Sequence, residues 1–177
     1  MNQWEKFSHE NRYFQNSLKK ELVVTLYGAY YPKTEKKFLE HLRDFMKKNG
    51  YVKTKLVSDY QNIFKHMKNV SDLSHQCIRM SDVNFFIVRK NGKNQGVVRE
   101  LSFLADDPTL IEKQNFSTIF TQKNSYPLLT KLILDDISEL DISVKTYTTQ
   151  TKLKKELLHT SSFFVRKLRS RLQLRTN

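Results

Sequence analysis

The stretch SDVNFFIVRKNGKNQGVVRELSFLAD, residues Ser81–Asp106, carries the clearest pattern of secondary structure in the chain. Its first part, Val83–Val88, is a short apolar run rich in β-branched and aromatic residues, which is typical of a central strand covered on both faces. A polar segment follows, in which Gly92 permits a turn. Apolar residues then recur at helical spacing, namely Val97, Val98, Leu101, Leu104 and Ala105. The stretch therefore predicts a buried strand, a loop and a helix that packs on the sheet.

Glu100 lies on this predicted helix, one turn after Gly96. In open α/β sheets, ligands bind outside the carboxyl ends of the strands, which is where such a helix begins. We therefore expect Glu100 to place a carboxylate beside the active site, if the chain has one.

The rest of the chain repeats this alternation of strand and helix. Further strands are expected at residues 21–27, 51–57, 116–121 and 141–148. Helices are expected at residues 33–47, around 63–67, at 72–80 with Ser71 as its cap, at 126–134 and from 151 onward. Alternating strands and helices favour a parallel sheet with right-handed crossovers. The predicted fold is therefore α/β, a three-layer sandwich with a five-stranded parallel, flavodoxin-like sheet plus terminal helices.

The predicted domain organisation is a central domain with two terminal segments. Residues 1–20 are expected to form a helical arm packed on the domain, and residues 21–150 the flavodoxin-like domain itself. Residues 151–177 are expected to form a basic amphipathic helix of that same domain, because no stretch has the composition of a linker.

Composition points to an intracellular protein. Cys77 is the only cysteine, so no intramolecular disulfide can form, which fits a reducing compartment. No apolar run approaches the roughly 20 residues of a membrane span, and the polar N-terminus is unlike a signal peptide. We therefore expect a soluble cytoplasmic protein without a membrane partner.

The net charge of +13 is concentrated near the C-terminus, where residues 150–177 contain eight basic residues and one acid. Such a segment can attract nucleic acid or an acidic protein, and Lys167, Arg169 and Arg171 are the candidate contacts. Two alternatives stay open for this helix: a merely solvated basic face over a core-facing apolar stripe, and an interface between copies in a homo-oligomer.

Several common catalytic motifs are missing. The sequence has no GxxxxGK[ST] loop, no GxGxxG turn after the first strand and no GxSxG elbow. Its five histidines show no paired ligand spacing, and a single cysteine makes no zinc site. We therefore expect neither a metal nor a cofactor.

Three segments together carry a resemblance to a known superfamily: LVVTLYGAYYP at Leu22–Pro32, DLSHQCIRMSDVNFFIV at Asp72–Val88 and NQGVVRELSFLAD at Asn94–Asp106. In these segments the chain resembles the nucleoside 2-deoxyribosyltransferase-like superfamily, whose Rossmann-like architecture is shared by TIR-domain NAD-cleaving proteins. The glycine-aromatic loop after the first strand is also similar to a GPY-like loop of small uncharacterised archaeal proteins.

The resemblance implies a nucleotide or nucleoside ligand and cleavage or transfer of its N-glycosidic bond. It makes Glu100 the catalytic carboxylate, which stabilises or traps an oxocarbenium-like sugar. Asp72 and Asp82 would assist it by holding the sugar or the base. The ligand-binding residues implied are Gly28, Tyr30, Asn94, Gln95 and Gly96.

Two departures from the family pattern keep a second hypothesis open. Asn94 stands where the transferases carry an aspartate, which weakens proton donation to a leaving base, and Val97 replaces a frequent hydroxyl residue. The alternative is a catalytically inactive module that senses a nucleotide, with a basic C-terminal helix for nucleic acid or an acidic partner.

Overall fold

A five-stranded, all-parallel sheet forms the centre of the molecule in the computed structural model, which describes residues 13–67, 69–125 and 142–175. The strand order is β2-β1-β3-β4-β5, the order of flavodoxin-like folds. The bounds are β1 Val24–Gly28, β2 Lys55–Leu56, β3 Val83–Val88, β4 Ser117–Gln122 and β5 Ser143–Tyr147. The predicted fold class is confirmed.

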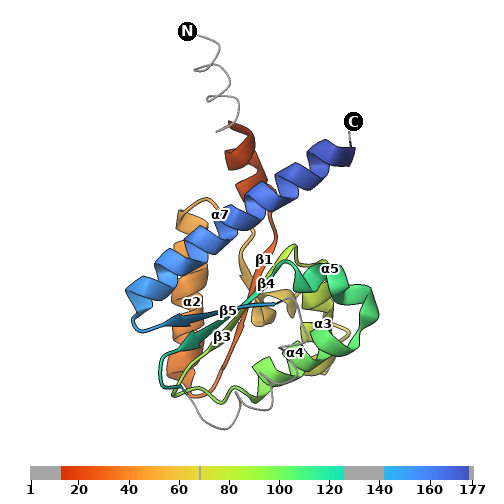
Figure 1. The fold of residues 1–177 in the computed structure, drawn as a ribbon. Helices are drawn as coiled ribbons and strands as arrows, with labels where there is room; N and C mark the ends of the chain where they lie inside the picture. The colour runs from red at the N-terminus through yellow and green to blue at the C-terminus, as the bar shows by residue number, and fades with distance from the viewer. Residues whose placement is uncertain (1–12, 68, 126–141, 176–177) are drawn as a thin grey trace.

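Helices cover both faces of the sheet, which gives three layers (Figure 1). Helices α2 (Lys33–Lys48) and α7 (Gln150–Arg175) lie on one face, and α3 (Val70–Met80) and α4 (Gln95–Asp106) lie on the other. Short helical turns complete the second layer: η1 (Val57–Tyr60), η2 (Pro108–Leu110) and α5 (Ile111–Gln114). Each crossover helix leaves the carboxyl end of a strand, so α2, α3 and α4 all begin at that edge of the sheet.

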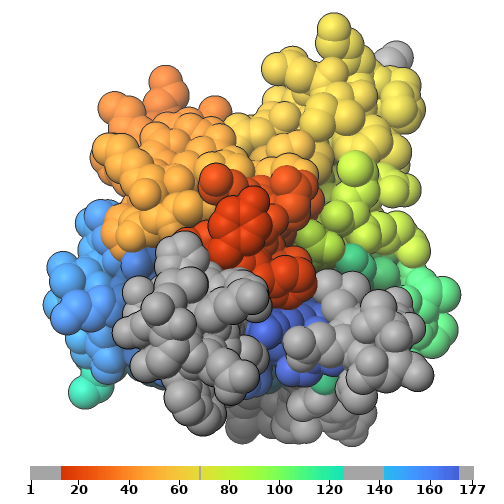
Figure 2. Space-filling model, turned by 90° about the horizontal axis from the view of Figure 1, so that it is seen from above, coloured from red at the N-terminus to blue at the C-terminus, as the bar shows by residue number. Residues whose placement is uncertain are grey.

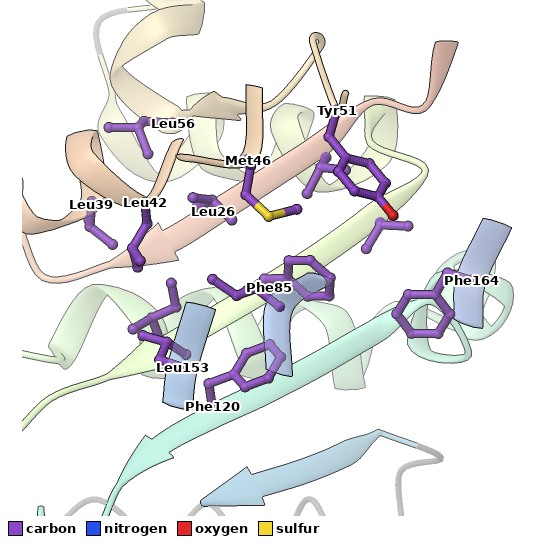
Figure 3. Close-up of a cluster of buried hydrophobic side chains, with 14 of the residues drawn as sticks. Leu26, Leu39, Leu42, Met46, Tyr51, Leu56, Phe85, Phe120, Leu153 and Phe164 are labelled. Carbon is purple, nitrogen blue, oxygen red and sulfur yellow. The ribbon is translucent and has the colours of Figure 1, made fainter. Parts of the chain in front are cut away.

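Alternating residues of the central strands divide the core into two clusters. On the α2 and α7 face, Leu26 and Phe85 pack against the buried stripe of α2 and against Leu153 of α7 (Figure 3). On the α3 and α4 face, Tyr27 stacks on Phe86 with ring centroids 4.8 Å apart. The buried residues of α7 thus serve the core, as the apolar stripe of the last helix predicts.

The second strand is shorter than the prediction of residues 51–57. Only Lys55–Leu56 is a strand, because the preceding residues form a turn in which Thr54 Oγ1 donates to the Tyr51 carbonyl at 2.7 Å. The helix predicted around residues 63–67 is also wrong. There Phe64 N bonds the Tyr60 carbonyl at 3.0 Å and Met67 N bonds the Phe64 carbonyl at 2.9 Å, which makes separate turns and no continuous helix.

Helix α3 begins earlier than the sequence pattern predicts. Its N-cap is Asn69, whose side-chain oxygen accepts from Ser71 N at 2.9 Å, so Ser71 lies inside the helix. The helix predicted at residues 126–134 lies outside the described residues.

The N-terminal segment contacts the body of the domain where it is described. Residues 13–21 are helical and lie beside α7 (Figure 2). The Arg169 guanidinium carbon is 5.4 Å from the Phe14 ring centroid, and Lys19 Nζ is 5.9 Å from that of Tyr51. Among the described helices, none is both long and apolar enough to span a membrane.

Candidate active site

Glu100 lies in the second turn of α4, at the junction of β1, α3 and α4. Its carboxylate is close enough to raise the pKa of Tyr27, Tyr30 and Cys77. For each of these three groups burial is the main cause of the raised pKa, which reaches about 12 for Tyr30 and Cys77. The Glu100 carboxylate therefore lies close to the buried side chains of Tyr27, Tyr30 and Cys77.

Burial also changes the acidity of Glu100 itself. Removal from water disfavours the charged carboxylate and raises the pKa of Glu100 to about 8, an increase that the Ser74 hydroxyl partly opposes. Its Oε2 atom is buried and has no hydrogen-bond partner among the described residues. An acid whose pKa lies near neutrality, with an oxygen left unused, is typical of a functional carboxylate.

Aromatic side chains pack helices α3 and α4 against each other near Glu100. The His75 and Phe103 rings stack with centroids 3.7 Å apart, and Arg79 lies 5.2 Å from the Phe103 centroid. Arg79 also pairs with Asp107 just beyond α4, at 2.6 Å. These contacts fix the two helices that provide Ser74, Cys77 and Glu100.

Gly28, the last residue of β1, and Tyr30, which follows that strand, lie at the carboxyl edge as expected. The Tyr30 hydroxyl accepts a hydrogen bond from Ser58 N at 3.3 Å, which ties the β1–α2 loop to η1. A Cβ atom on Gly28 would lie 2.8 Å from Leu39 Cδ2 and 3.3 Å from the Ile87 carbonyl oxygen. Gly28 is thus required for close packing of α2 on β1, which is independent of any ligand.

The N-cap and first turn of α4 bring Asn94, Gln95 and Gly96 to the same edge. The Asn94 side chain is occupied by the loop itself, since Nδ2 donates to the Arg89 carbonyl at 2.9 Å and Oδ1 accepts from Arg89 N at 3.5 Å. Gln95 and Gly96 are exposed, and a Cβ on Gly96 would meet nothing within 4 Å. Of the three, Gln95 and Gly96 have space for a ligand beside them.

The two aspartates of the predicted site lie at opposite ends of α3. Asp72 is exposed in the first turn of α3, at the same edge of the sheet as Glu100. Asp82 precedes β3 at the amino edge, where its Oδ2 accepts from Val23 N at 2.8 Å. The fold therefore brings Asp72 toward the Glu100 side and keeps Asp82 away from it.

Sequence reasoning missed a buried ion pair on the other face of the same edge. Arg89, directly after β3, donates from Nη1 to Glu35 Oε2 at 3.0 Å, and the Glu35 side chain is only 4% exposed. The Arg89 guanidinium carbon also lies 3.7 Å from the Phe38 ring centroid. The signal was present, because Arg89 is a charged residue that directly follows a buried strand.

The three candidate cations of α7 contact aromatic rings of the domain. Lys167 Nζ and the Arg171 guanidinium carbon lie 5.1 Å and 4.9 Å from the Phe116 centroid, and Arg169 reaches Phe14. Lys167 Nζ also donates to the Asn115 carbonyl at 3.1 Å. These side chains help to hold α7 against the domain. Their role in binding nucleic acid or an acidic partner stays a prediction.

Among the described residues, no three His, Cys, Asp or Glu side chains gather into a group that could hold a metal ion.

The chain was compared with known protein families, sequences and structures. No family model matches the chain, and no curated protein sequence matches it. Among solved structures, it is similar to the CMP N-glycosidase BcmB of Clostridium botulinum, with a TM-score of 0.47 and 15% identity. That likeness covers 76% of this chain and 96% of that one.

Proposed function

We propose that this chain binds a nucleotide or nucleoside at the carboxyl edge of its sheet and cleaves or transfers the N-glycosidic bond. The observation that supports the proposal most is Glu100, a buried carboxyl with an unpartnered oxygen and a pKa raised to about 8. Glu100 in its ionised form is the principal catalytic group. Asp72, Tyr30, Gln95 and Gly96 complete the proposed site, and Asp82 is left out because it lies at the amino edge.

The chemistry required of such a site is stabilisation of a positive sugar. As the bond from the anomeric carbon to the base nitrogen breaks, the base leaves with the electron pair and takes up a proton. An ionised carboxylate beside that carbon stabilises the oxocarbenium-like state or bonds to it, and then water or an acceptor nucleoside completes hydrolysis or transfer. Poor hydration around Glu100 strengthens this electrostatic effect.

A test of this proposal is release of free base, followed by chromatography. Purified protein is incubated with NAD, deoxynucleosides and nucleoside monophosphates, with the Glu100→Gln variant in parallel. Base released by the wild type and not by the variant supports the proposal and names the substrate. The absence of base from every compound contradicts it.

The rate should depend on pH in a way that reports Glu100. If the ionised carboxylate is required, kcat/KM increases from pH 6 to about pH 8 and levels off above, following the raised pKa of Glu100. Tyr30 and Cys77 stay protonated over that range, since the pKa of each is about 12. The rise should persist in His75→Gln, because burial lowers the pKa of His75 from 6.5. A profile that falls between pH 6 and 8 contradicts the assigned role.

One observation favours the inactive sensing module as a second candidate. The side chain of Asn94 is bonded to the backbone of Arg89 at both its ends, so it has little freedom to assist a departing base. In that case the pocket binds a nucleotide without turnover. Calorimetric binding of a nucleoside monophosphate by wild type and Glu100→Gln alike, with no base released, is the result expected of such a module.

A further inference from the structure

A cavity lies between the edge strand β5 and the outer part of α7, away from Glu100. It has a volume of about 460 Å³ and opens near the amino ends of β4 and β5. Pockets of this size hold small organic molecules. The cavity is thus on the opposite face and the opposite edge of the sheet from the proposed active site. Its lining residues include Thr118, Lys145, Thr160, Phe163 and Lys167.

Two lysine ammonium groups that line this cavity supply hydrogen-bond donors. Lys145 Nζ donates to Thr160 Oγ1 at 3.0 Å and to Glu156 Oε2 at 3.2 Å, so one of its three protons is left over. Because Thr160 Oγ1 accepts from that ammonium, its own proton is directed elsewhere. Among the described residues, Lys167 Nζ donates to the backbone and side-chain oxygens of Asn115, at 3.1 and 3.5 Å, which uses two of its three protons, and it lies 5.1 Å from the Phe116 centroid.

Thr118 provides the observation that points to a ligand. Its side chain is fully buried, and its Oγ1 has no hydrogen-bond partner among the described residues, although Thr118 lines the cavity. A buried hydroxyl without a partner costs free energy, and such groups commonly bond a ligand or a water. The lining has two ammonium groups, four hydroxyls and no carboxylate, which favours an anion.

Aromatic residues define the other end of the cavity. Phe163 is 50% exposed, and its ring lies 5.7 Å from the buried Phe164 ring. An exposed phenyl ring beside donor groups fits a flat apolar body attached to an anionic head. We propose that this cavity is a second binding site, separate from the catalytic one, for a phosphate monoester of a small aromatic or nucleoside-like molecule.

Phenyl phosphate is the probe for this site. Inorganic phosphate and phenol are tested beside it, because they represent its anionic and its aromatic part. Binding is measured on the full chain by calorimetry and by amide chemical shifts in NMR spectra. Lys167→Met is expected to weaken phenyl phosphate about tenfold, as removal of a charge-assisted contact does. Lys155→Met, which removes the same charge from an exposed position of α7, should change the affinity by less than about twofold.

Two further variants separate a binding role from a folding role. Thr118→Val removes a hydroxyl that has no partner, so the urea midpoint should stay equal or increase while phenyl phosphate binding weakens severalfold. Phe163→Ala should weaken phenyl phosphate and leave inorganic phosphate unchanged. The Glu100→Gln variant should bind the probe as the wild type does, so this test is independent of catalysis.

Three results would each overturn the second site. They are no detectable binding of phenyl phosphate, equal weakening by Lys167→Met and Lys155→Met, and chemical-shift changes confined to the loops at the carboxyl edge.

Discussion

Replacing Glu100 by glutamine is expected to lower base release by roughly 10³-fold or more while the protein stays folded. Glutamine has nearly the same shape and cannot carry the negative charge that a developing positive sugar requires. The affinity for the intact ligand should change little, because the charge acts mainly in the transition state. Single-turnover base release and calorimetric binding, measured on the same preparations, check both parts of this expectation.

The same variant should also be free of a loss in stability that the wild type undergoes at high pH, when the buried Glu100 carboxyl ionises. The pKa of Glu100 is about 8 in the folded protein, above its ordinary value of 4.5, so the folded state binds the proton more tightly than the unfolded state. The resulting stabilisation is complete below pH 4.5 and is lost as the pH rises through 8. Relative to Glu100→Gln, the wild type should therefore lose free energy of unfolding between pH 5 and pH 9.

The size of that loss follows from linkage. Each unit of pKa difference corresponds to about 1.4 kcal/mol, so a difference of a few kcal/mol is expected at pH 9. Urea unfolding at pH 5, 7 and 9 measures it. Glu40→Gln is the matched control, because Glu40 pairs at the surface with Lys36 and should leave the pH dependence as in the wild type. Parallel curves for Glu100→Gln and wild type would contradict the buried, protonated state of Glu100.

The sheet could be predicted because its strands are encoded locally. Val83–Val88 matches β3 residue for residue, since a continuous apolar run bounded by polar residues has one plausible conformation in an α/β chain. The strand predicted at residues 51–57 is longer than the observed Lys55–Leu56, because the length of an edge strand depends on its pairing with the neighbouring strand. Local pattern carries no information about that partner.

The candidate site was only partly predictable, for a related reason. Glu100 could be placed because it follows a central strand at helical spacing. The environment that raises its pKa comes from Tyr27, Ser74 and Cys77, which are distant in sequence and carry no local pattern for that role. The resemblance predicts that Asp82 assists Glu100, but the strand direction places Asp82 at the amino end of β3, away from Glu100.

Replacing Arg89 by methionine is expected to cause the largest loss of stability, about 3–5 kcal/mol. Methionine can keep contact with Phe38, but it leaves the Glu35 carboxylate buried without its cationic partner. Glu35 lies in the first turn of α2, and the helix N-terminus alone compensates a buried carboxylate only weakly. The measurement is urea unfolding at pH 7, read by circular dichroism.

Two control variants determine whether the loss of stability in Arg89→Met comes from the unpaired Glu35 carboxylate. The double variant Glu35→Gln with Arg89→Met removes both charges and should recover a large part of the stability, because no buried carboxylate remains unpaired. Lys53→Met breaks the exposed pair with Glu21 and should cost no more than about 1 kcal/mol. If the double variant is as unstable as Arg89→Met, the loss instead comes from the guanidinium packed on Phe38. In that case the ion pair does not account for how the β3–α4 loop is held against α2.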